Sequence, residues 1–303
     1  MARIPQSLRL LLGSSAGKVL AIDTANPKEP AKELANHGRY VTSLVLTGQV
    51  VISGSYDGKL IWWDLAKEKM VRTLDAHTKQ VRQLAISTDG TTLASVGDDM
   101  ACRLWNAATG VRLQELRGHE PRTPTHFGSM LYCCAFAPNG QHLATGDRVG
   151  HVIVWDVATG KQLATVEAPA LYTWDAVQRI RSIGGVRALA FSPDGVHLAI
   201  GGVGQINNVD GLGGPSRVEV FDWQGRKRIY EFTGAQGLIN RLIYHPRNQW
   251  LCALGGGGNG IVIFHDPKTR ALIHQANMPM FVHDAVFNED QTTLFAVGHQ
   301  KIA

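Results

Sequence analysis

The feature that most constrains this chain is a motif that recurs along it at near-constant spacing. Residues 52–64 (ISGSYDGKLIWWD) align without a gap with residues 94–106 (ASVGDDMACRLWN) and 144–156 (ATGDRVGHVIVWD). Weaker copies of the same pattern occur at 11–23, 218–222 and 253–265. A repeat of this length indicates one supersecondary unit that is used several times.

The last aromatic residue of each copy sets the period. Trp63 and Trp105 are 42 residues apart, and Phe221 and Phe264 are 43 residues apart. Each unit begins with an alternating apolar run, a turn rich in Asp, Asn and Gly, and a second apolar run, which predicts a β-hairpin. A third run that ends in the motif and a fourth short run follow. Four short strands in roughly 42 residues match the length of one β-propeller blade.

These residues resemble the WD-repeat (WD40) family of β-propellers. The resemblance is carried by the Trp-Asp pairs at 63–64 and 155–156, by Asp-Ala-His at 75–77 and by Leu-Arg-Gly-His at 116–119. The Ser-Pro-Asp-Gly turn at 192–195 is in the style of bacterial repeats. The resemblance covers essentially the whole chain and implies an all-β fold of four-stranded antiparallel blades. Seven blades are expected, with six as the alternative.

We expect a single domain over residues 1–303 with incomplete blades at both ends. The N-terminal segment supplies a second, third and fourth strand with no first strand before them. The C-terminal segment supplies a first and second strand and then stops, as in a chain cut short, so unpaired strands at the seam would invite self-association. Approximate blade boundaries are 1–36, 37–76, 77–118, 119–167, 186–233, 237–277 and 281–303, with 168–185 as an insertion.

The resemblance also implies structural roles for the tryptophans. In the family, a His, a Ser or Thr, an Asp and the motif Trp form a hydrogen-bonded tetrad. Trp62, one position before the motif Trp63, faces the other side of the strand and is expected to pack against the next blade, or else to form an exposed patch. The tetrads implied here are His37, Ser53, Asp57, Trp63 and His77, Ser95, Asp99, Trp105.

The third repeat keeps only part of this tetrad. His119, Thr145 and Trp155 are present, but Val149 stands at the position of the acid. The later repeats have Phe221 and Phe264 in place of Trp and lack a matching His. We therefore expect the later blades to be held mainly by packing.

Function is expected where the chain departs from the repeat. Extra residues lie at 119–130, 168–185 and 202–217. In the family, connections between blades and connections between the second and third strands of a blade open on the same face, so the three loops are expected to gather there. Expanded loops on a rigid scaffold are typical recognition sites. The function predicted is a non-catalytic protein–protein interaction scaffold. Its partner, a protein or peptide, would dock on this face.

The second insertion has the most informative composition. Asp175 and Gln178 form the pattern of a helix start, and Gly184 with Gly185 would end the helix. Trp, Tyr and Arg side chains are frequent at the energetic centres of interfaces. The residues predicted to bind a partner are Arg122, His126, Tyr172, Trp174, Arg179, Arg181, Asn207 and Asn208.

Other functions find less support in the sequence. A small-ligand or enzymatic propeller that uses the central channel is the alternative, but the inward positions are apolar or small, and no catalytic, cofactor or metal-binding pattern is present. The pI of about 9.1 is compatible with nucleic-acid binding, yet no concentrated basic face is evident, so we expect none. Four cysteines without metal spacing and the lack of an apolar run of membrane-spanning length predict a cytoplasmic protein with reduced thiols and no membrane contact.

Overall fold

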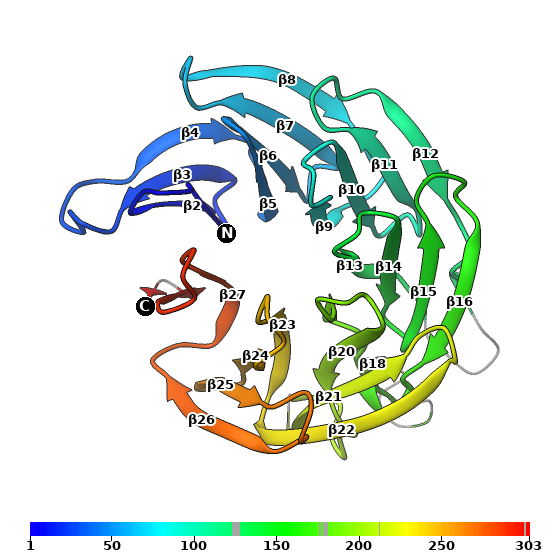
Figure 1. Ribbon diagram of the computed structural model, residues 1–303. Coiled ribbons are helices and arrows are strands. Elements are labelled where there is room, and N and C mark those ends of the chain that lie inside the picture. Colours follow the sequence, from blue (N-terminus) through cyan, green and yellow to red (C-terminus); the bar gives the residue numbers. More distant parts are fainter. Residues whose placement is uncertain (123–127, 176, 178–180, 212, 300) are drawn as a thin grey trace. The chain divides into compact units, whose positions relative to one another are not determined.

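The computed structural model describes residues 1–122, 128–175, 177, 181–211, 213–299 and 301–303. Apart from the short 3-10 helix η1 (Pro169–Leu171), the regular structure of these residues consists of strands. The strands form six four-stranded antiparallel sheets, one three-stranded sheet and one two-stranded hairpin (Figure 1). The predicted all-β propeller with seven blades is confirmed.

The described residues divide into two compact units. The first contains Met1–Arg117 and Val286–Leu294, and the second contains Gly118–Ala285 and Phe295–Ala303. The single domain and the blade boundaries expected from the repeat stay predictions.

The first unit holds three of the four-stranded sheets, each with its strands in chain order. The first sheet is β1 (Ala2–Arg3), β2 (Arg9–Gly13), β3 (Lys18–Asp23) and β4 (Lys32–Asn36). The second is β5 (Val41–Thr47), β6 (Val50–Ser55), β7 (Lys59–Asp64) and β8 (Lys69–Asp75). The third is β9 (Val81–Ile86), β10 (Thr92–Gly97), β11 (Cys102–Asn106) and β12 (Arg112–Leu116).

The second unit holds the other three four-stranded sheets and the hairpin. The sheets are β13 (Leu131–Phe136), β14 (His142–Asp147), β15 (His151–Asp156) and β16 (Gln162–Glu167); β19 (Ala188–Phe191), β20 (His197–Val203), β21 (Pro215–Asp222) and β22 (Lys227–Gln236); and β23 (Leu238–Tyr244), β24 (Leu251–Gly256), β25 (Gly260–His265) and β26 (Leu272–Met278). The hairpin is β17 (Tyr172–Asp175) and β18 (Arg181–Gly184). The three-stranded sheet is β27 (Val282–Phe287), β28 (Leu294–Gly298) and β29 (Lys301–Ile302).

The turn chemistry of the repeat explains the hairpins at the start of several sheets. The β9–β10, β13–β14 and β19–β20 turns each end on a glycine with positive φ, at Gly90 (72°), Gly140 (69°) and Gly195 (74°). Only glycine adopts this conformation without a steric penalty. The first two apolar runs of each repeat are therefore folded back on each other, as the sequence predicted.

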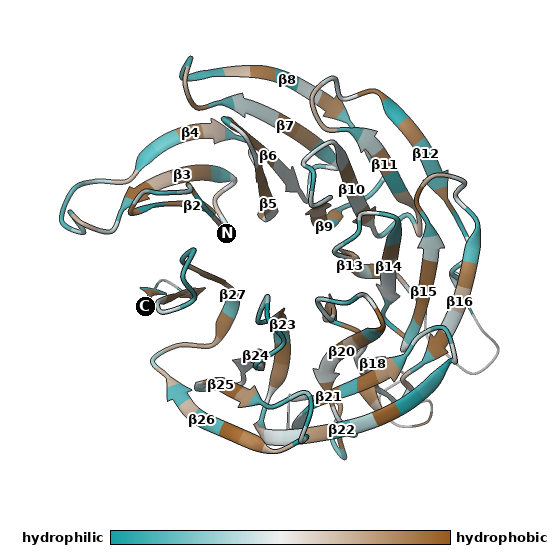
Figure 2. Ribbon diagram, in the orientation of Figure 1, coloured by the Kyte–Doolittle hydropathy of each residue, from teal (hydrophilic) through white to brown (hydrophobic). Residues whose placement is uncertain are grey.

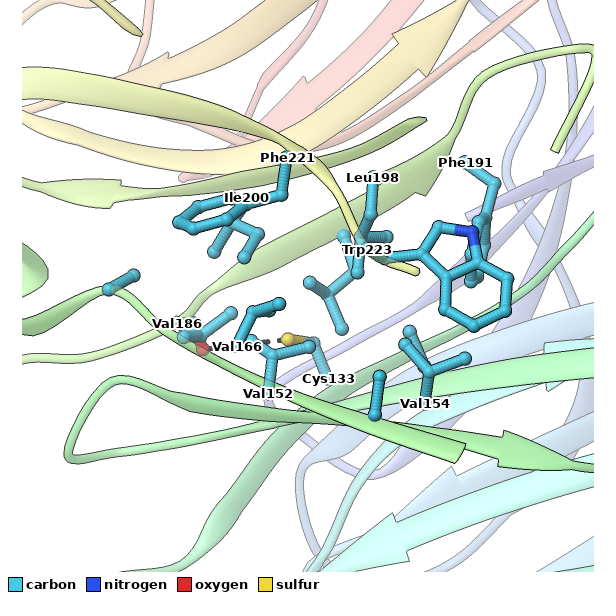
Figure 3. Close-up of a cluster of buried hydrophobic side chains, with 14 of the residues drawn as sticks. Cys133, Val152, Val154, Val166, Val186, Phe191, Leu198, Ile200, Phe221 and Trp223 are labelled. Atoms are coloured by element: carbon cyan, nitrogen blue, oxygen red, sulfur yellow. Dashed lines mark hydrogen bonds between the residues drawn. The ribbon is translucent and has the colours of Figure 1, made fainter. Parts of the chain in front are cut away.

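Neighbouring sheets within each unit pack face to face through their apolar side chains. In the second unit, Cys133, Val152 and Val154 of the β13–β16 sheet face Phe221 of β21 and Trp223, which follows β21 (Figure 3). The indole N–H of Trp223 donates to the carbonyl oxygen of Gly195 at 2.8 Å, so this large ring has a polar partner as well as apolar contacts. Such inter-sheet cores bury the apolar face that one blade alone would leave in water.

The β19–β22 sheet contains polar contacts in addition to the apolar packing expected for the later repeats. The carboxylate of Glu219 on β21 is about 1% exposed and accepts hydrogen bonds from Arg217 Nε at 2.7 Å and Arg228 Nη1 at 3.1 Å. A buried carboxylate needs such partners because desolvation penalises an uncompensated charge. An ion-pair network thus occupies the interior of a sheet that lacks the tetrad.

Both ends of the chain contain one more strand than the sequence indicated. β1 pairs with β2 through Ala2↔Leu11 and Arg3↔Leu10, and β29 pairs with β28 through Val297↔Ile302 and Gly298↔Lys301. The expectation that the first blade lacks its first strand, and that the chain stops before a third strand in the last blade, was therefore wrong. Two-residue strands are too short to show an alternating pattern, which is why the sequence gives no sign of them.

Candidate functional site

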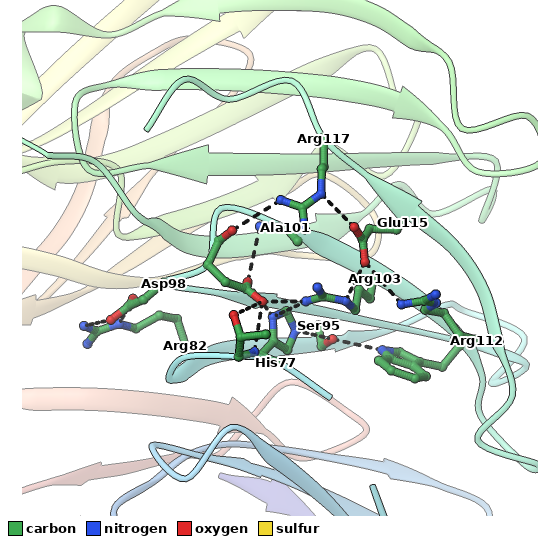
Figure 4. Close-up of polar contacts among 12 residues, drawn as sticks. His77, Arg82, Ser95, Asp98, Ala101, Arg103, Arg112, Glu115 and Arg117 are labelled. Atoms are coloured by element: carbon green, nitrogen blue, oxygen red, sulfur yellow. Dashed lines mark hydrogen bonds and ion pairs between the residues drawn. The ribbon is translucent and has the colours of Figure 1, made fainter. Parts of the chain in front are cut away.

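The relay in the β9–β12 sheet joins four side chains by hydrogen bonds. His77 Nδ1 donates to Asp99 Oδ1 at 2.8 Å, Ser95 Oγ lies 2.8 Å from His77 Nε2, and Trp105 Nε1 donates to Ser95 Oγ at 2.9 Å (Figure 4). Because a carboxylate only accepts, it fixes the proton of the imidazole on Nδ1. Every buried polar group in this chain of contacts has a partner.

Arg103 on β11 closes this relay with a permanent positive charge. Its Nη1 donates to Asp99 Oδ2 at 2.8 Å, and its Nε donates to Glu115 Oε2 at 2.9 Å. Burial raises the pKa of Asp99, but the hydrogen bonds and charges of His77 and Arg103 outweigh burial and hold the pKa well below its usual range. The acid of this relay is therefore strongly held in its ionised form.

The relay in the β5–β8 sheet lacks the tryptophan bond that the family pattern implies. His37 Nδ1 donates to Asp57 Oδ2 at 3.0 Å, and His37 Nε2 lies 2.7 Å from Ser53 Oγ. The Nε1 of Trp63, however, is buried and has no hydrogen-bond partner among the described residues. Burial lowers the pKa of His37 despite the attraction of Asp57.

Trp62, the neighbour of Trp63, is an inter-sheet packing residue. It is 1% exposed and lies in the apolar cluster between the β5–β8 and β9–β12 sheets, together with Leu84 and Trp105. Its Nε1 donates to the carbonyl oxygen of Ala107 at 2.7 Å. The packing alternative thus holds for Trp62, and the exposed-patch alternative does not.

The relay in the β13–β16 sheet is complete, which corrects the alignment that left Val149 in the place of the acid. His119 Nδ1 donates to Asp147 Oδ2 at 3.0 Å, His119 Nε2 lies 2.9 Å from Thr145 Oγ1, and Trp155 Nε1 donates to Thr145 Oγ1 at 2.8 Å. Asp147 ends β14, two residues before the aligned position. It is the only carboxylate between Thr145 and Trp155, and this could have identified it from the sequence.

The environment of Asp147 differs from that of Asp99. Asp147 Oδ1 accepts the backbone N–H groups of Val149 at 3.0 Å and His151 at 2.9 Å. The His151 ring lies between two acids, with Nδ1 3.6 Å from Asp147 Oδ2 and Nε2 3.2 Å from Glu167 Oε2. Burial is the main cause that raises the pKa of Glu167. The side chain beside this acid is thus the imidazole of His151, whereas the guanidinium of Arg103 lies beside Asp99.

The described part of the insertion at 168–185 contains η1 and the paired strands β17 and β18, so the predicted helix start at Asp175 was wrong, and Gln178 lies outside the described residues. β17 and β18 pair through Tyr172↔Gly184, Thr173↔Ile183, Trp174↔Ser182 and Asp175↔Arg181. Asp175 Oδ1 does accept a backbone N–H, but from Val177 in a turn. Thr, Trp and Tyr favour strands, and Gly184 (φ 98°) approaches the Leu171 carbonyl more closely than a side chain allows.

Hydrogen bonds connect the three insertions. Arg148, in the β14–β15 turn, donates its backbone N–H to the carbonyl oxygen of Met130 at 3.0 Å and its Nη2 to the carbonyl oxygen of Ser182 at 3.0 Å. The backbone N–H of Ile206 donates to Thr173 Oγ1 at 3.1 Å. The end of the first insertion, the hairpin and the start of the third insertion are thus joined. We call these described parts of 119–130, 168–185 and 202–217 the insertion surface.

Apolar contacts strengthen the link between the hairpin and the third insertion. Ile183 of β18 packs against a buried cluster formed by Val203, Ile206 and Leu238. Only one side of the hairpin makes this contact, because Thr173 and Ile183 are directly opposite in the register and share a face. The insertion surface is therefore fixed on the underlying sheets by both polar and apolar contacts.

The predicted partner-binding residues differ in how much side chain they expose. Arg122, Asn207 and Asn208 are exposed, Trp174 is partly buried, and Tyr172 is buried at 8% exposure. Asn208 Oδ1 accepts the backbone N–H of Asp210, as in a simple turn. Arg181 begins β18. His126 and Arg179 lie outside the described residues.

Two residues of this surface were missed by sequence reasoning. Val177, in the turn of the hairpin, is 86% exposed, the largest exposure among the large apolar side chains of the described chain. Arg148 links two insertions from a position inside the repeat. The position of Val177 inside an insertion was a usable signal in the sequence, whereas the role of Arg148 depends on tertiary contacts and had no such signal.

Two further kinds of feature are absent from the described residues. They contain no group of three or more His, Cys, Asp or Glu side chains placed to hold a metal ion. Within the same residues, no helix has the length and apolar composition needed to cross a membrane. The four cysteines are buried free thiols.

Curated relatives match about half of the chain. The chain is 33% identical over 174 residues to nuclear distribution protein PAC1-2 of Uncinocarpus reesii. This match covers 50% of this chain and 33% of that protein. The chain is 27% identical over 186 residues to apoptotic protease-activating factor 1 of Rattus norvegicus, a match that covers 61% of this chain and 14% of that protein. It is 30% identical over 154 residues to protein groucho of Drosophila melanogaster, a match that covers 50% of this chain and 20% of that protein. The chain thus matches only a third or less of the length of each of these relatives.

The family comparison agrees with the repeats seen in the sequence. The model of the WD domain, G-beta repeat, matches residues 28–64, 68–106 and 110–156. These segments contain the His-Ser/Thr-Trp positions of the β5–β8, β9–β12 and β13–β16 sheets. The matched segments, which lie within residues 28–156, are therefore similar to WD40 repeats, as the sequence predicted.

Proposed function

We propose that this protein is a non-catalytic interaction scaffold that docks a protein or peptide partner on the insertion surface. The observation that carries the proposal is the set of hydrogen bonds through Arg148 and Thr173, which join three departures from the repeat into one surface. The residues of these three insertions are additional to the strands and turns of the repeat, and expanded loops on a rigid scaffold are typical recognition sites. The names of the relatives span nuclear distribution and apoptotic protease activation, which fits a reusable binding module better than one reaction.

Exposed side chains of the insertion surface supply the contacts. Val177 offers an apolar anchor at the hairpin turn, and Arg122, Asn207 and Asn208 offer charge and hydrogen bonds around it. Apolar anchors inside a polar rim are typical of protein interfaces. Tyr172 is assigned to the scaffold, because its side chain is buried. A cytoplasmic location agrees with the buried free thiols and belongs to the same proposal.

Affinity capture with three baits tests the proposal. One bait is the intact chain, and the second has residues 175–181 replaced by an Asn-Gly turn, which leaves the buried Leu171 and Tyr172 in place. The third carries Val196→Asp, a substitution of an exposed valine in the β19–β20 turn, at the opposite end of β20 from the third insertion. All three must show the same circular dichroism and melting behaviour.

We expect at least one partner to bind the intact chain and the Val196→Asp bait and to be lost from the hairpin variant. If the hairpin variant retains every partner of the intact chain, the insertion surface is not the docking site. Loss of partners from the Val196→Asp bait alone would place docking at the opposite ends of the strands.

A further inference from the structure

Positively charged side chains gather at one end of the three four-stranded sheets of the second unit. In each of these sheets the strands are antiparallel and follow one another in chain order, so the first and third turns lie at the same end. The insertions 168–185 and 202–217 follow a fourth and a second strand, which places them at the opposite end. We call the end of these sheets with the first and third turns the basic end.

Contacts between the turns show that the basic ends of the three sheets lie side by side. The ring of Trp223, in the β21–β22 turn, is 5.1 Å from the ring of His142 at the start of β14, and its Nε1 donates to the carbonyl oxygen of Gly195 in the β19–β20 turn. The guanidinium carbon of Arg270, in the β25–β26 turn, is 5.4 Å from the centre of the Tyr230 ring on β22. The three sheets therefore share one surface at this end.

The cations of the basic end are exposed and have no ion-pair partner among the described residues. They lie in the third turn of each sheet, at the start of β22 and in the first turn of the β23–β26 sheet: Lys161, Arg226, Lys227, Arg247, Lys268 and Arg270. No concentrated basic face is evident in the sequence, because these residues are spread from 161 to 270. The fold brings them together.

The acids at the same end are occupied by other groups. Four aspartates each accept a backbone N–H group two or three residues further along their own turn, at 2.7–3.0 Å: Asp156, Asp194, Asp222 and Asp266. The carboxylates of Glu219 and Glu231 pair with Arg228. These acids lower the net charge of the basic end, but the charged side chains left free to bind a ligand are the six cations.

Apolar side chains are exposed beside these cations. Val196, in the β19–β20 turn, is 45% exposed, and Leu272 and Ile273 are 54% and 53% exposed. Figure 2 colours the start of β26 as hydrophobic and the start of β22 as hydrophilic. Anionic lipid surfaces attract Lys and Arg, and exposed apolar side chains enter the boundary between the headgroups and the acyl chains. The basic end offers both kinds of contact.

The width and the composition of the basic end distinguish between classes of anionic ligand. Stacked sheets lie about 10 Å apart, so three of them span roughly 20 Å, which is wider than one extended acidic segment of a protein. The phosphates of a nucleic acid would bind the cations but would leave exposed apolar side chains such as Val196 without a partner. A broad surface with both charge and apolar depth fits a membrane best.

We propose that the basic end binds the surface of an anionic lipid membrane, with the six cations at the headgroups and Val196 at the acyl boundary. This contact does not depend on the proposed scaffold function, because the insertion surface lies at the opposite end of the strands. The expectation of no membrane contact was based on the lack of an apolar run that could span a bilayer. Such a run is not needed for contact with the surface of a membrane.

Co-sedimentation of the full chain with lipid vesicles tests the proposal. Vesicles of phosphatidylcholine with about 30% phosphatidylserine are compared with vesicles of phosphatidylcholine alone. We expect binding to the anionic vesicles only. Binding should be lost when the salt concentration rises from about 0.05 M to about 0.5 M, because salt screens the attraction between the cations and the headgroups.

Two double variants with the same net charge separate the basic end from the charge of the whole chain. Lys227→Gln/Lys268→Gln should bind anionic vesicles about 30-fold more weakly, since each Lys or Arg near an anionic surface strengthens binding about fivefold. Arg39→Gln/Arg122→Gln removes two exposed arginines outside the basic end and should bind like the intact chain. Val196→Ser should weaken vesicle binding about threefold to tenfold and leave binding to a DNA duplex unchanged. All variants must melt like the intact chain.

Each other outcome overturns the proposal. An intact chain that does not sediment with anionic vesicles would show that the basic end binds no membrane. Equal weakening in both double variants would assign the binding to the net charge of the chain. An unchanged Val196→Ser variant, or tighter binding to a DNA duplex or to polyglutamate at the same concentration of negative charge, would mean that the basic end takes a nucleic acid or an acidic protein segment instead.

Discussion

The β9–β12 and β13–β16 sheets contain the same relay, but its acid comes from different positions, and different groups compensate the charge of that acid. In the first, Asp99 follows the strand and is held by the guanidinium of Arg103. In the second, Asp147 is the last residue of its strand and is held by two backbone N–H groups beside His151. The imidazole, the hydroxyl and the indole occupy equivalent positions in both.

This difference shows which part of the relay is fixed by the fold. The indole-bearing strand and the hydroxyl-bearing strand are hydrogen-bonded neighbours, so the ladder sets the Ser95–Trp105 and Thr145–Trp155 geometry directly. The acid comes from the end of the second strand or from the turn after it, where the backbone has more freedom. Several positions there can therefore bring a carboxylate to the histidine.

The largest expected effect is that of removing the buried acid of the β13–β16 sheet. Asp147→Ala leaves the His119 Nδ1–H and the backbone N–H groups of Val149 and His151 without their acceptor, and we expect a loss of about 3–5 kcal/mol in the free energy of unfolding. Urea denaturation measures it. Asp156→Ala, which removes a turn carboxylate near the surface, is the control. Equal losses in both variants would mean that the Asp147 relay adds no special stability.

Removing the cation of the β9–β12 relay is expected to have the next largest effect. Arg103→Met leaves the buried carboxylate of Asp99 without its guanidinium partner, and we expect a loss of about 2–3 kcal/mol in the free energy of unfolding, measured by urea denaturation. The double variant Arg103→Met/Asp99→Asn should lose less than the sum of the single losses, because the uncompensated charge is gone. Additive losses would contradict a direct coupling between the two side chains.

Lowering the pH should weaken the β5–β8 sheet before it affects the contribution of Asp99. Because burial lowers the pKa of His37 below 6.5, the unfolded chain takes up a proton that the folded chain does not, and stability is lost as the pH falls from 7 to 5. The Asp99 pKa is lowered from 3.8, so its contribution is present above that value and is lost only below it. We expect the stability of His37→Gln to change less between pH 7 and 5 than that of the intact chain, as followed by denaturant unfolding. An unchanged pH dependence would exclude His37 as its source.

The smallest effect is expected at Trp63. Trp63→Phe removes an indole N–H that is buried without a partner among the described residues. Apart from the loss caused by the smaller ring, the free energy of unfolding should change by no more than about 1 kcal/mol. Trp105→Phe removes a similar area and also breaks the bond to Ser95, and should cost about 1–2 kcal/mol more. Differential scanning calorimetry of the two variants compares them, and equal shifts in melting temperature would show that Trp63 Nε1 is in fact bonded.

Most of the fold could be predicted from the sequence because the repeat determines where its strands and turns lie. Turn glycines such as Gly90 and Gly140, and the period of Trp63, Trp105 and Trp155, determine hairpins and strands locally. Strands β1 and β29 could not be predicted, since two residues show no period. The acid at Asp147 was missed because gap-free alignment assumes one turn conformation, although Asp147 is the only carboxylate in that stretch.

The candidate site was predicted less well than the fold. The three insertions were located by their extra length, but a short helix was predicted to start at Asp175 and to end at Gly184 and Gly185, because Asp175 and Gln178 match a cap pattern. Pairing between two four-residue strands depends on tertiary contacts, such as those of Thr173 with Ile206 and of Ser182 with Arg148. Such contacts leave no local pattern in the sequence.

The most direct test of the scaffold function is photo-crosslinking from two single positions. A photoreactive amino acid is placed at Val177 in the hairpin turn or at Val196 in the β19–β20 turn, and each protein is irradiated in cell extract. We predict a discrete covalent adduct with the same partner that the intact bait captures, formed from position 177 and absent from position 196. An adduct from position 196 alone, or equal adducts from both positions, would contradict docking on the insertion surface.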